Sequence, residues 1–133
     1  SLMARNFFAL GAFYSDPAYR ERAREMLIAI QGSLQRYPGQ YSNWMHLALW
    51  LEAPFYEVVI TGPKALEKLA SLQGNYLPNA LLAASEGPVT GPLFENRHST
   101  DATRIFICQF GQCRQPVTEI AEALEILEVG RKT

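Results

Sequence analysis

The chain changes its apolar periodicity at Pro54, and this change limits the folds that it can adopt. Before Pro54 the apolar residues recur every three or four positions, as they do on helices. After it, the run Phe55–Ile60 is short, aromatic and β-branched, which is typical of a strand. We therefore expect a helical segment at 6–53 and a segment with strands and helices at 54–133, packed as one compact unit.

Three helices are expected before Pro54, at 6–14, 17–37 and 41–52. Asp16 is a suitable N-cap for the second, and Pro17 suits its first turn, where no amide bond is lost. The aromatic surface of these helices exceeds what one small sheet needs to cover it, so some of it is expected to pack on another partner. Residues 1–5, which include Ser1-Leu2-Met3, are expected to be a vector-derived remnant and a leader.

The second segment reads as strand, helix, strand, long loop, strand and helix. Strands are expected at 55–60, 80–84 and 104–108, with helices at 64–72 and after Thr118. The two strands on either side of a helix should run parallel, with a right-handed crossover. The sequence thus predicts an α/β fold, in which N-terminal helical hairpins pack with a small three-stranded, mainly parallel sheet and two further helices.

Composition limits the partners of the chain. Its 133 residues suit one domain, and its net charge of −1 gives no field that attracts nucleic acid. No apolar run approaches the ~20 residues of a membrane span, so no membrane partner is expected. Two cysteines do not make a secreted disulfide scaffold, and a cytoplasmic location is therefore the default.

Cys108 and Cys113 lie at the end of the last strand-like run and in the turn that follows it. The simplest interpretation is that they are buried thiols that only pack. A disulfide or a thiol-redox pair is an alternative, although four residues separate them instead of the two of Cys-x-x-Cys. A zinc site would need His98 and Asp101 at no recognised spacing. No metal and no cofactor are expected.

The long loop at 85–102 contains a second candidate site, a polar cluster that could bind a sugar or another small ligand. Its members are Glu95, Arg97, His98 and Asp101. Binding residues often lie on loops, but a solvated loop is the simpler alternative. A phosphate could also sit at the helix start after Thr61-Gly62-Pro63. One glycine falls far short of a nucleotide-binding motif, however, and Pro63 removes an amide donor.

Several motifs resemble those of one known family. The stretch Ser15-Asp16-Pro17-x-Tyr19-Arg20-x-Arg22-Ala23 resembles a helical-hairpin signature of toroids built from paired helices. Three more are similar to the C-terminal end of thioredoxin-domain-containing proteins of the YyaL and spermatogenesis-associated type. These are Glu57-Val-Val-Ile-Thr-Gly62, Tyr76-Leu-Pro-Asn79 and Ile107-Cys108-x4-Cys113-x-x-Pro116-Val-Thr118.

The resemblance implies a fold and a set of partners. In that family a thioredoxin-like domain precedes an (α/α)6 toroid, which is similar to N-acylglucosamine 2-epimerases and six-hairpin glycosidases. The chain would then be a C-terminal structural or interaction segment, with 6–53 as the end of the toroid, and would not be an active enzyme alone. Its partners would be the remaining domains of the parent protein, or other copies bound through the aromatic helices. The resemblance carries over no catalytic residue.

Overall fold

A computed structural model describes residues 1–132, with side chains described for residues 1–128. The chain divides into two compact units, which meet in sequence between Ala53 and Pro54. The first unit contains only helices, and the second contains a sheet with helices. The change in periodicity at Pro54 therefore coincides with the boundary between the units.

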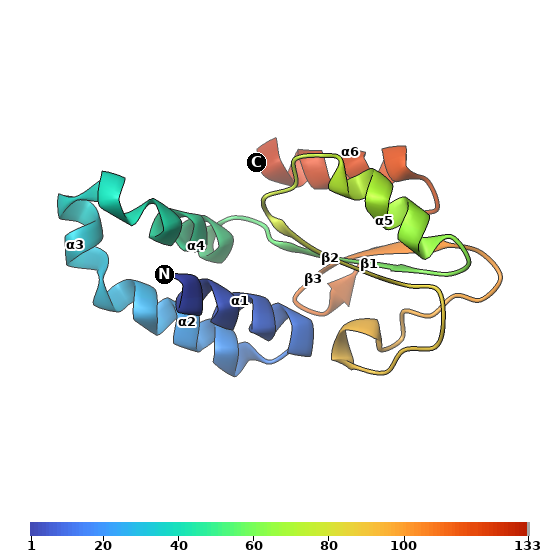
Figure 1. The fold of residues 1–133 in the computed structure, drawn as a ribbon, viewed down its shortest axis with the longest axis horizontal. Coiled ribbons are helices and arrows are strands. Elements are labelled where there is room, and N and C mark those ends of the chain that lie inside the picture. The colour runs from blue at the N-terminus through green and yellow to red at the C-terminus, as the bar shows by residue number, and fades with distance from the viewer. Residues whose placement is uncertain (133) are drawn as a thin grey trace. The chain divides into compact units, whose positions relative to one another are not determined.

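The first unit has four α-helices and one 3-10 helix (Figure 1): α1 (Leu2–Tyr14), α2 (Pro17–Ala29), α3 (Gln31–Arg36), η1 (Pro38–Tyr41) and α4 (Ser42–Glu52). Helix α1 ends at Ser15, which adopts a left-handed conformation with φ 53°. Asp16 then accepts a hydrogen bond of 2.9 Å from the amide of Ala18. The N-cap predicted at Asp16 is confirmed.

The continuous helix expected at 17–37 is wrong. At Ile30 the backbone leaves helical geometry, with φ −106° and ψ 5°, and its amide bonds to the carbonyl of Leu27. This bond spans three residues instead of four, so the turn tightens and α2 ends there. The carbonyl of Ile30 accepts from Leu34, which starts α3.

Aromatic and cationic side chains join α1, α2 and α4 in the first unit. Phe8 of α1 is fully buried, and its ring lies 5.5 Å from that of Trp50 on α4. The guanidinium of Arg20 on α2 lies 5.5 Å from the Phe8 ring, and that of Arg5 lies 4.9 Å from the Trp50 ring. These cation–π contacts bring two charged groups to an apolar interior.

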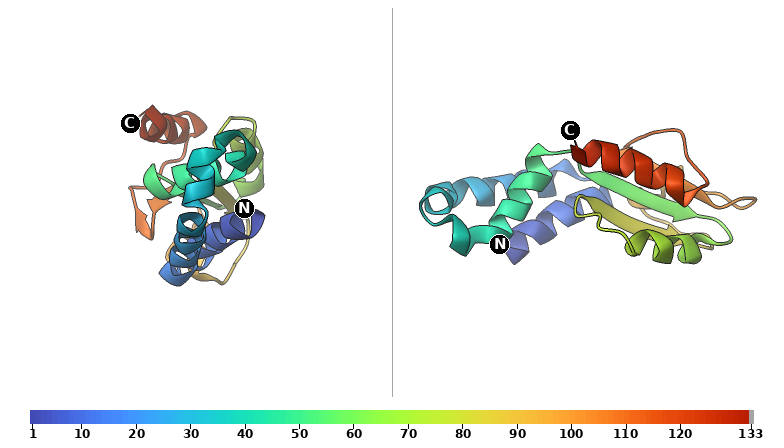
Figure 2. Two further views of the ribbon diagram at one scale, coloured as in Figure 1. Left: turned by 90° about the vertical axis from the view of Figure 1, so that its left-hand side faces the viewer. Right: turned by 90° about the horizontal axis from the view of Figure 1, so that it is seen from above.

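The second unit is a four-stranded sheet with helices. Its strands are β1 (Tyr56–Thr61), β2 (Ala80–Ser85), β3 (Arg104–Gln109) and β4 (Gln112–Cys113), and its helices are α5 (Ala65–Gln73), the 3-10 helix η2 (Pro92–Phe94) and α6 (Ile120–Lys132). The strand order is β2-β1-β3-β4. The right-hand view of Figure 2 shows β1 and β2 side by side and pointing the same way.

The expectation of three mainly parallel strands is wrong, because only β1 and β2 are parallel. Strand β3 runs antiparallel to β1, and the unexpected β4 runs antiparallel to β3. The cause is the path of the 86–103 segment, the connection from β2 to β3. It delivers Arg104 opposite Thr61, at the carboxyl end of β1, so β3 begins there and must run back.

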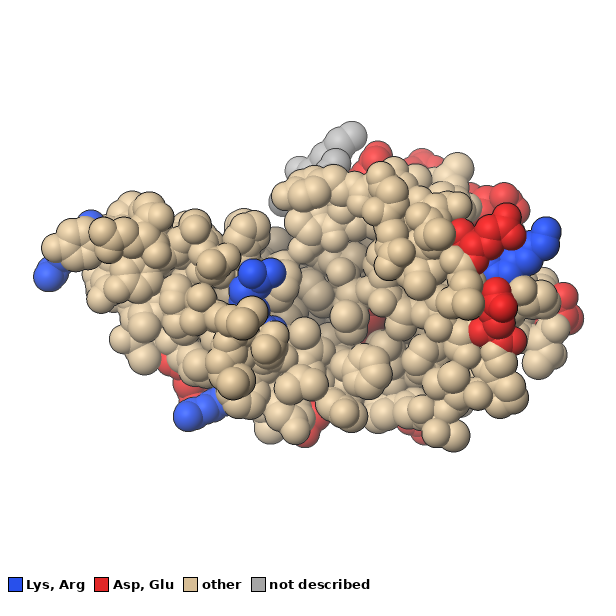
Figure 3. Space-filling model, viewed as in Figure 1, with Lys and Arg blue, Asp and Glu red and all other residues tan. Residues whose placement is uncertain are grey.

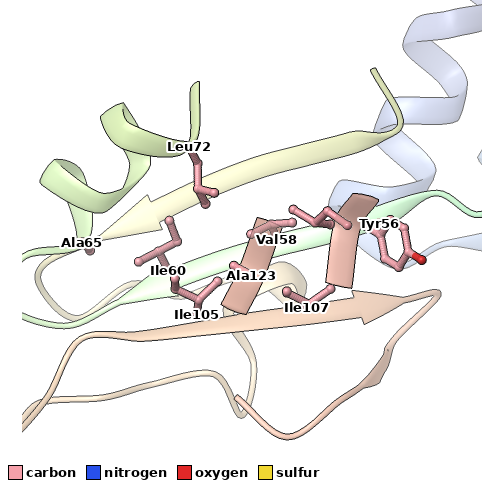
Figure 4. Close-up of a cluster of buried hydrophobic side chains, with 9 residues drawn as sticks. Tyr56, Val58, Ile60, Ala65, Leu72, Ile105, Ile107 and Ala123 are labelled. Atoms are coloured by element: carbon pink, nitrogen blue, oxygen red, sulfur yellow. The ribbon is translucent and has the colours of Figure 1, made fainter. Parts of the chain in front are cut away.

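Helices and the 86–103 segment cover opposite faces of the sheet. Alternate residues of β1 and β3 (Tyr56, Val58, Ile60, Ile105 and Ile107) form a core with α5 and α6 (Figure 4). The other face carries Val59, Phe106 and Cys108, which pack with Leu93 and Phe94 from the 86–103 segment. The alternation expected for the third strand, with Cys108 on the side of Phe106, is confirmed.

The chain approaches Gly62 closely, directly after β1. Its φ of 126° is rarely adopted by other residues, and a Cβ there would lie 2.6 Å from the carbonyl oxygen of Ala102. We expect Gly62→Ala to lower the free energy of unfolding by at least about 3 kcal/mol, because it adds both strain and a clash. Urea denaturation measures this loss.

Gly87→Ala is the matched control for that substitution. A Cβ at Gly87 would meet nothing within 4 Å. Its stability should therefore stay within about 0.5 kcal/mol of the original chain. An equal effect of the two substitutions would contradict the close approach at Gly62.

Candidate functional site

The carboxyl ends of the parallel strands β1 and β2 are the natural place for a site. Thr61 pairs in register with Ser85, so the two strands end at the same level. Beyond these ends the chain leaves to opposite faces, since α5 covers one face and the 86–103 segment covers the other. Ligands of open α/β sheets bind at such a divergence, in the crevice outside the carboxyl ends of the strands.

A pocket of about 440 Å³ lies at this edge. We call it the β1/β2 pocket. It is lined by the ends of both strands and by two stretches of the 86–103 segment: Thr61, Pro63, Ser85, Glu86, Gly87, Pro88, Val89, Thr90, His98, Ser99 and Thr100. Its volume lies within the range of roughly 300–1,000 Å³ that is usual for small-molecule sites.

Close contacts and hydrogen bonds hold one wall of this pocket in place, the stretch around Thr100. The close approach of Gly62 to Ala102 and Thr103 leaves no room for a side chain between them. The Thr103 hydroxyl accepts a hydrogen bond of 3.0 Å from the amide of Lys64, and the Ser99 hydroxyl donates to the carbonyl of Ala102. These contacts hold the residues around Thr100 across the end of β1.

Thr61 lines the pocket, but its hydroxyl oxygen is buried within the protein. The residue is only 4% exposed, and its Oγ1 has no hydrogen-bond partner in the part of the chain that the structure describes. Ser85, its neighbour on β2, is different, because its hydroxyl donates to the carbonyl of Gly87 at 2.8 Å. Buried hydroxyls are normally hydrogen-bonded, so the state of Thr61 is unusual.

The four loop residues expected to form a ligand site do not act together. Only His98 lines the pocket. Arg97 is buried and lies 3.7 Å from the carboxylate of Glu57, where it also donates to the carbonyl of Leu93 at 2.6 Å. Asp101 pairs with Arg104 at 3.7 Å, and Glu95 is exposed and does not line the pocket.

Neighbouring groups lower the pKa of the Asp101 carboxyl group. Hydrogen bonds from the backbone amides of Asp101 and Ala102 lower its pKa, with help from the Ser99 hydroxyl and the charge of Arg104. A lowered folded-state pKa stabilises the loop above the ordinary pKa of an aspartate, and that stability is lost as the pH falls through the folded value.

The start of α5 has little capacity for an anion. The amide of Ala65 bonds to the carbonyl of Gly62, and that of Lys64 bonds to Thr103. The next amide, of Leu66, bonds to the carboxylate of Glu86 at 3.4 Å. Free amides are what attracts phosphate to a helix start. With these amides engaged and a carboxylate beside them, the phosphate site considered at Gly62-Pro63 is disfavoured.

The structure joins Cys108 and Cys113 in a disulfide between paired positions of β3 and β4. Phe110 and Gly111 form the loop between these strands, and both have positive φ, as a tight hairpin turn requires. Cys108 is 1% exposed, whereas Cys113 is exposed. Cys113 lines a hollow of about 250 Å³ together with Arg114, Gln112, Gln109, Tyr56 and Ile107.

Thr61, Ser85 and Glu86 were not expected in a site. Each lies at the end of a strand, and the parallel pairing of β1 and β2 brings them to one edge. The expected β-α-β order could have predicted this meeting, because parallel strands place their carboxyl ends together. Nothing in the sequence predicts that the 86–103 segment returns to the same edge and adds His98 to the pocket.

Comparison with known proteins gives no relative, since no family model, curated protein or solved structure matches the chain. In the part that the structure describes, no group of three or more His, Cys, Asp or Glu residues could hold a metal ion. None of the described helices is long and apolar enough to cross a membrane. The helices and the mixed sheet define the chain as a mixed α/β protein.

The buried pair of Glu57 and Arg97 should be essential for the second unit. We expect Arg97→Met to lower the free energy of unfolding by about 3–5 kcal/mol, because it leaves the buried carboxylate of Glu57 without its counter-charge. The double variant Glu57→Gln/Arg97→Met should recover part of that loss, as urea denaturation would measure. Purely additive losses would contradict a coupled pair.

Proposed function

We propose that this chain is a structural and interaction segment of a larger thioredoxin-like, toroid-containing protein, and that α1 is the element that docks it. The observation that carries this proposal is a group of exposed large apolar side chains in the C-terminal turns of α1, opposite its buried side. Exposed apolar side chains that lie together on one side of a helix are normally covered by a partner.

One side of α1 is covered within the first unit. Its residues Ala4, Phe8, Gly11 and Ala12 are buried, and α1 packs there against α2 and α4. The small side chains at three of these positions let the helices approach closely. This side needs no further partner.

The other side of α1 is exposed, with Asn6 near its middle and large apolar residues in its C-terminal turns. We call these apolar residues the α1 outer face, and they are Leu10, Phe13 and Tyr14, of which Tyr14 is 49% exposed. At about 100° per residue, these positions fall within roughly 120° of the helix circumference. Single exposed apolar residues are ordinary, but a continuous row of them marks an interaction surface.

Two further observations support the proposal. Ile28, Met45 and Leu49 on α2 and α4 are also large, apolar and exposed. Charged side chains are few over the helices of the first unit on the face shown in Figure 3. The resemblance to toroids built from paired helices agrees with this reading, since helices of such a toroid pack against hairpins on either side. The partner would be further helices of the parent protein.

Without those helices, the α1 outer face should bind a second copy of the chain. We expect sedimentation velocity to show a reversible dimer or larger species that grows with concentration. Leu10→Gln/Phe13→Gln should shift the chain to monomer, because it replaces two exposed apolar groups with polar ones. It should also reduce binding of a hydrophobic dye.

Leu66→Gln is the matched control, because Leu66 is an exposed leucine on α5 in the other unit. It should leave association unchanged. A monodisperse monomer that binds no hydrophobic dye would contradict the proposal. If Leu66→Gln reduced association as much as Leu10→Gln/Phe13→Gln does, the association could not be assigned to α1.

Thiol–disulfide exchange is a second candidate function, because Cys113 is exposed and lies beside the cation Arg114. A partner thiolate would attack the sulfur of Cys113, the disulfide would break, and Cys108 would leave as a thiolate and take up a proton. The leaving sulfur is the weakness of this scheme. Cys108 lies among Val59, Leu93 and Phe106, an apolar setting that disfavours a thiolate.

We therefore expect the disulfide to be mainly structural. Closing so short a loop should stabilise the chain by roughly 2 kcal/mol, and dithiothreitol should remove that amount. Cys113→Ser, which cannot form the disulfide, should show no effect of the same reductant. Urea denaturation with and without dithiothreitol measures both.

A thiol titration in glutathione buffers separates the two functions. A structural disulfide should stay oxidised down to about −300 mV. We also propose a cytoplasmic location, from the low cysteine content. Disulfides found in the cytoplasm are usually redox-active, so the titration result bears directly on the redox function. Reversible opening at the potential of the glutathione pool would favour the redox function and contradict the structural one.

A further inference from the structure

We propose that the outer edge of β2 binds an extended peptide segment of a partner protein, which adds a strand to the sheet beside β2. This edge lies in the second unit and is separate from the α1 outer face. The proposal rests on the open side of β2, on the lack of features that normally protect such an edge, and on an exposed leucine of α5 beside it.

Strand β2 stands at the end of the sheet and, in the described part of the chain, pairs only with β1. All six residues of β1 are buried, whereas all six residues of β2 are half-buried. This difference is expected for a strand with one side open to solvent. A partner can therefore reach the backbone of β2 from that side, which we call the β2 edge.

Two hydrogen bonds identify the backbone groups of the β2 edge. The carbonyl of Asn79 accepts from the amide of Tyr56 at 2.8 Å, and the carbonyl of Ser85 accepts from the amide of Gly62 at 3.3 Å. The bonds of a parallel ladder recur at every second residue, so the odd-numbered residues of β2 face β1. Three residues therefore turn their N–H and C=O groups away from the sheet: Ala80, Leu82 and Ala84.

The β2 edge lacks the features that normally keep other strands away. Proteins protect their edge strands by short length, charged side chains, proline or a bulge. Strand β4, at the opposite end of the sheet, has only two residues. Strand β2 has six residues, Ala-Leu-Leu-Ala-Ala-Ser, with no charge and no proline, and it pairs with β1 residue for residue. Its row of N–H and C=O groups matches another extended backbone, as in peptides that bind by strand addition.

Helix α5 places an apolar side chain beside this edge. Lys68 of α5 donates to the carbonyl of Thr118, just before α6, so that side of α5 faces α6. Leu66 lies about 160° around the helix from Lys68 and thus points away from α6. In the right-hand view of Figure 2, α5 lies on the β2 side of the strand pair and α6 on the β1 side. Leu66 is 53% exposed. The bound peptide should therefore be uncharged, with apolar side chains on the face toward α5.

A phage-displayed library of random linear peptides, selected against the whole chain, tests the proposal. Enriched peptides should carry apolar residues at alternate positions. A synthetic copy should slow the amide exchange of Ala80, Leu82 and Ala84, because the peptide supplies acceptors for these amides. Peptides that protect only α1 would support docking by α1 and overturn this proposal. A library that yields no peptide protecting β2 would also overturn it.

Ala84→Pro tests the hydrogen bonds of the β2 edge. The Ala84 amide points outward, and edge strands tolerate proline where the lost amide faces solvent. The melting temperature should change by only a few degrees, but peptide binding should weaken roughly tenfold, because one hydrogen bond is lost. Ala83→Pro is the comparison, because its amide faces β1, and it should lower the melting temperature strongly. Unchanged peptide binding by Ala84→Pro, or equal melting temperatures of the two variants, would overturn the assignment of the outward groups.

Leu66→Gln tests the site through an exposed residue, so that the result does not depend on a substitution in the sheet. It should weaken peptide binding roughly fivefold, because an apolar contact is lost. Leu49→Gln is the matched control, because Leu49 is a leucine of α4, in the other unit, with a similar exposure of 61%. Equal peptide binding by the two glutamine variants would overturn the placement of the peptide beside α5.

Discussion

The buried ion pair between Glu57 and Arg97 holds the 86–103 segment against the sheet, and the second unit depends on this contact. The segment has one 3-10 helix and otherwise irregular backbone, and it packs Leu93 and Phe94 against its face of the sheet. Hydrophobic contact is non-directional, whereas an ion pair joins two named groups. Pairing Arg97 with a carboxylate on the central strand gives one position, because a buried charge away from its partner is costly.

That position has consequences at both ends of the segment. Beyond Arg97 the chain places His98 in the wall of the β1/β2 pocket and then packs tightly on Gly62. It ends where β3 must start at the carboxyl end of β1, so the direction of β3 follows from it. The ion pair, the pocket and the mixed sheet are thus parts of one arrangement within the second unit.

Features set by neighbouring residues could be predicted from the sequence. The cap at Asp16, the first strand and the alternation around Cys108 all depend on side chains a few positions apart. The direction of β3 could not be predicted, because it depends on a long segment without periodicity. A two-residue strand such as β4 has too few side chains to show a pattern.

The candidate site was predictable only in part, for the same reason. His98 was predicted because polar side chains on loops often bind ligands. Arg97 and Asp101 were predicted for the same reason, but both have structural partners. Thr61 was not predicted as a site residue, because threonine is common in strands and its position ends an apolar strand. Only the structure shows that it is buried and lines the pocket. The apolar character of α1, in contrast, is visible in its sequence.

Hydrogen–deuterium exchange at two protein concentrations tests most directly the claim that the α1 outer face is an interaction surface. Peptides from α1 should exchange more slowly at the higher concentration, because association covers that helix and suppresses its local opening. Peptides from β1 and α5 should exchange equally at both. Exchange of α1 that is independent of concentration, or protection confined to the second unit, would contradict the account.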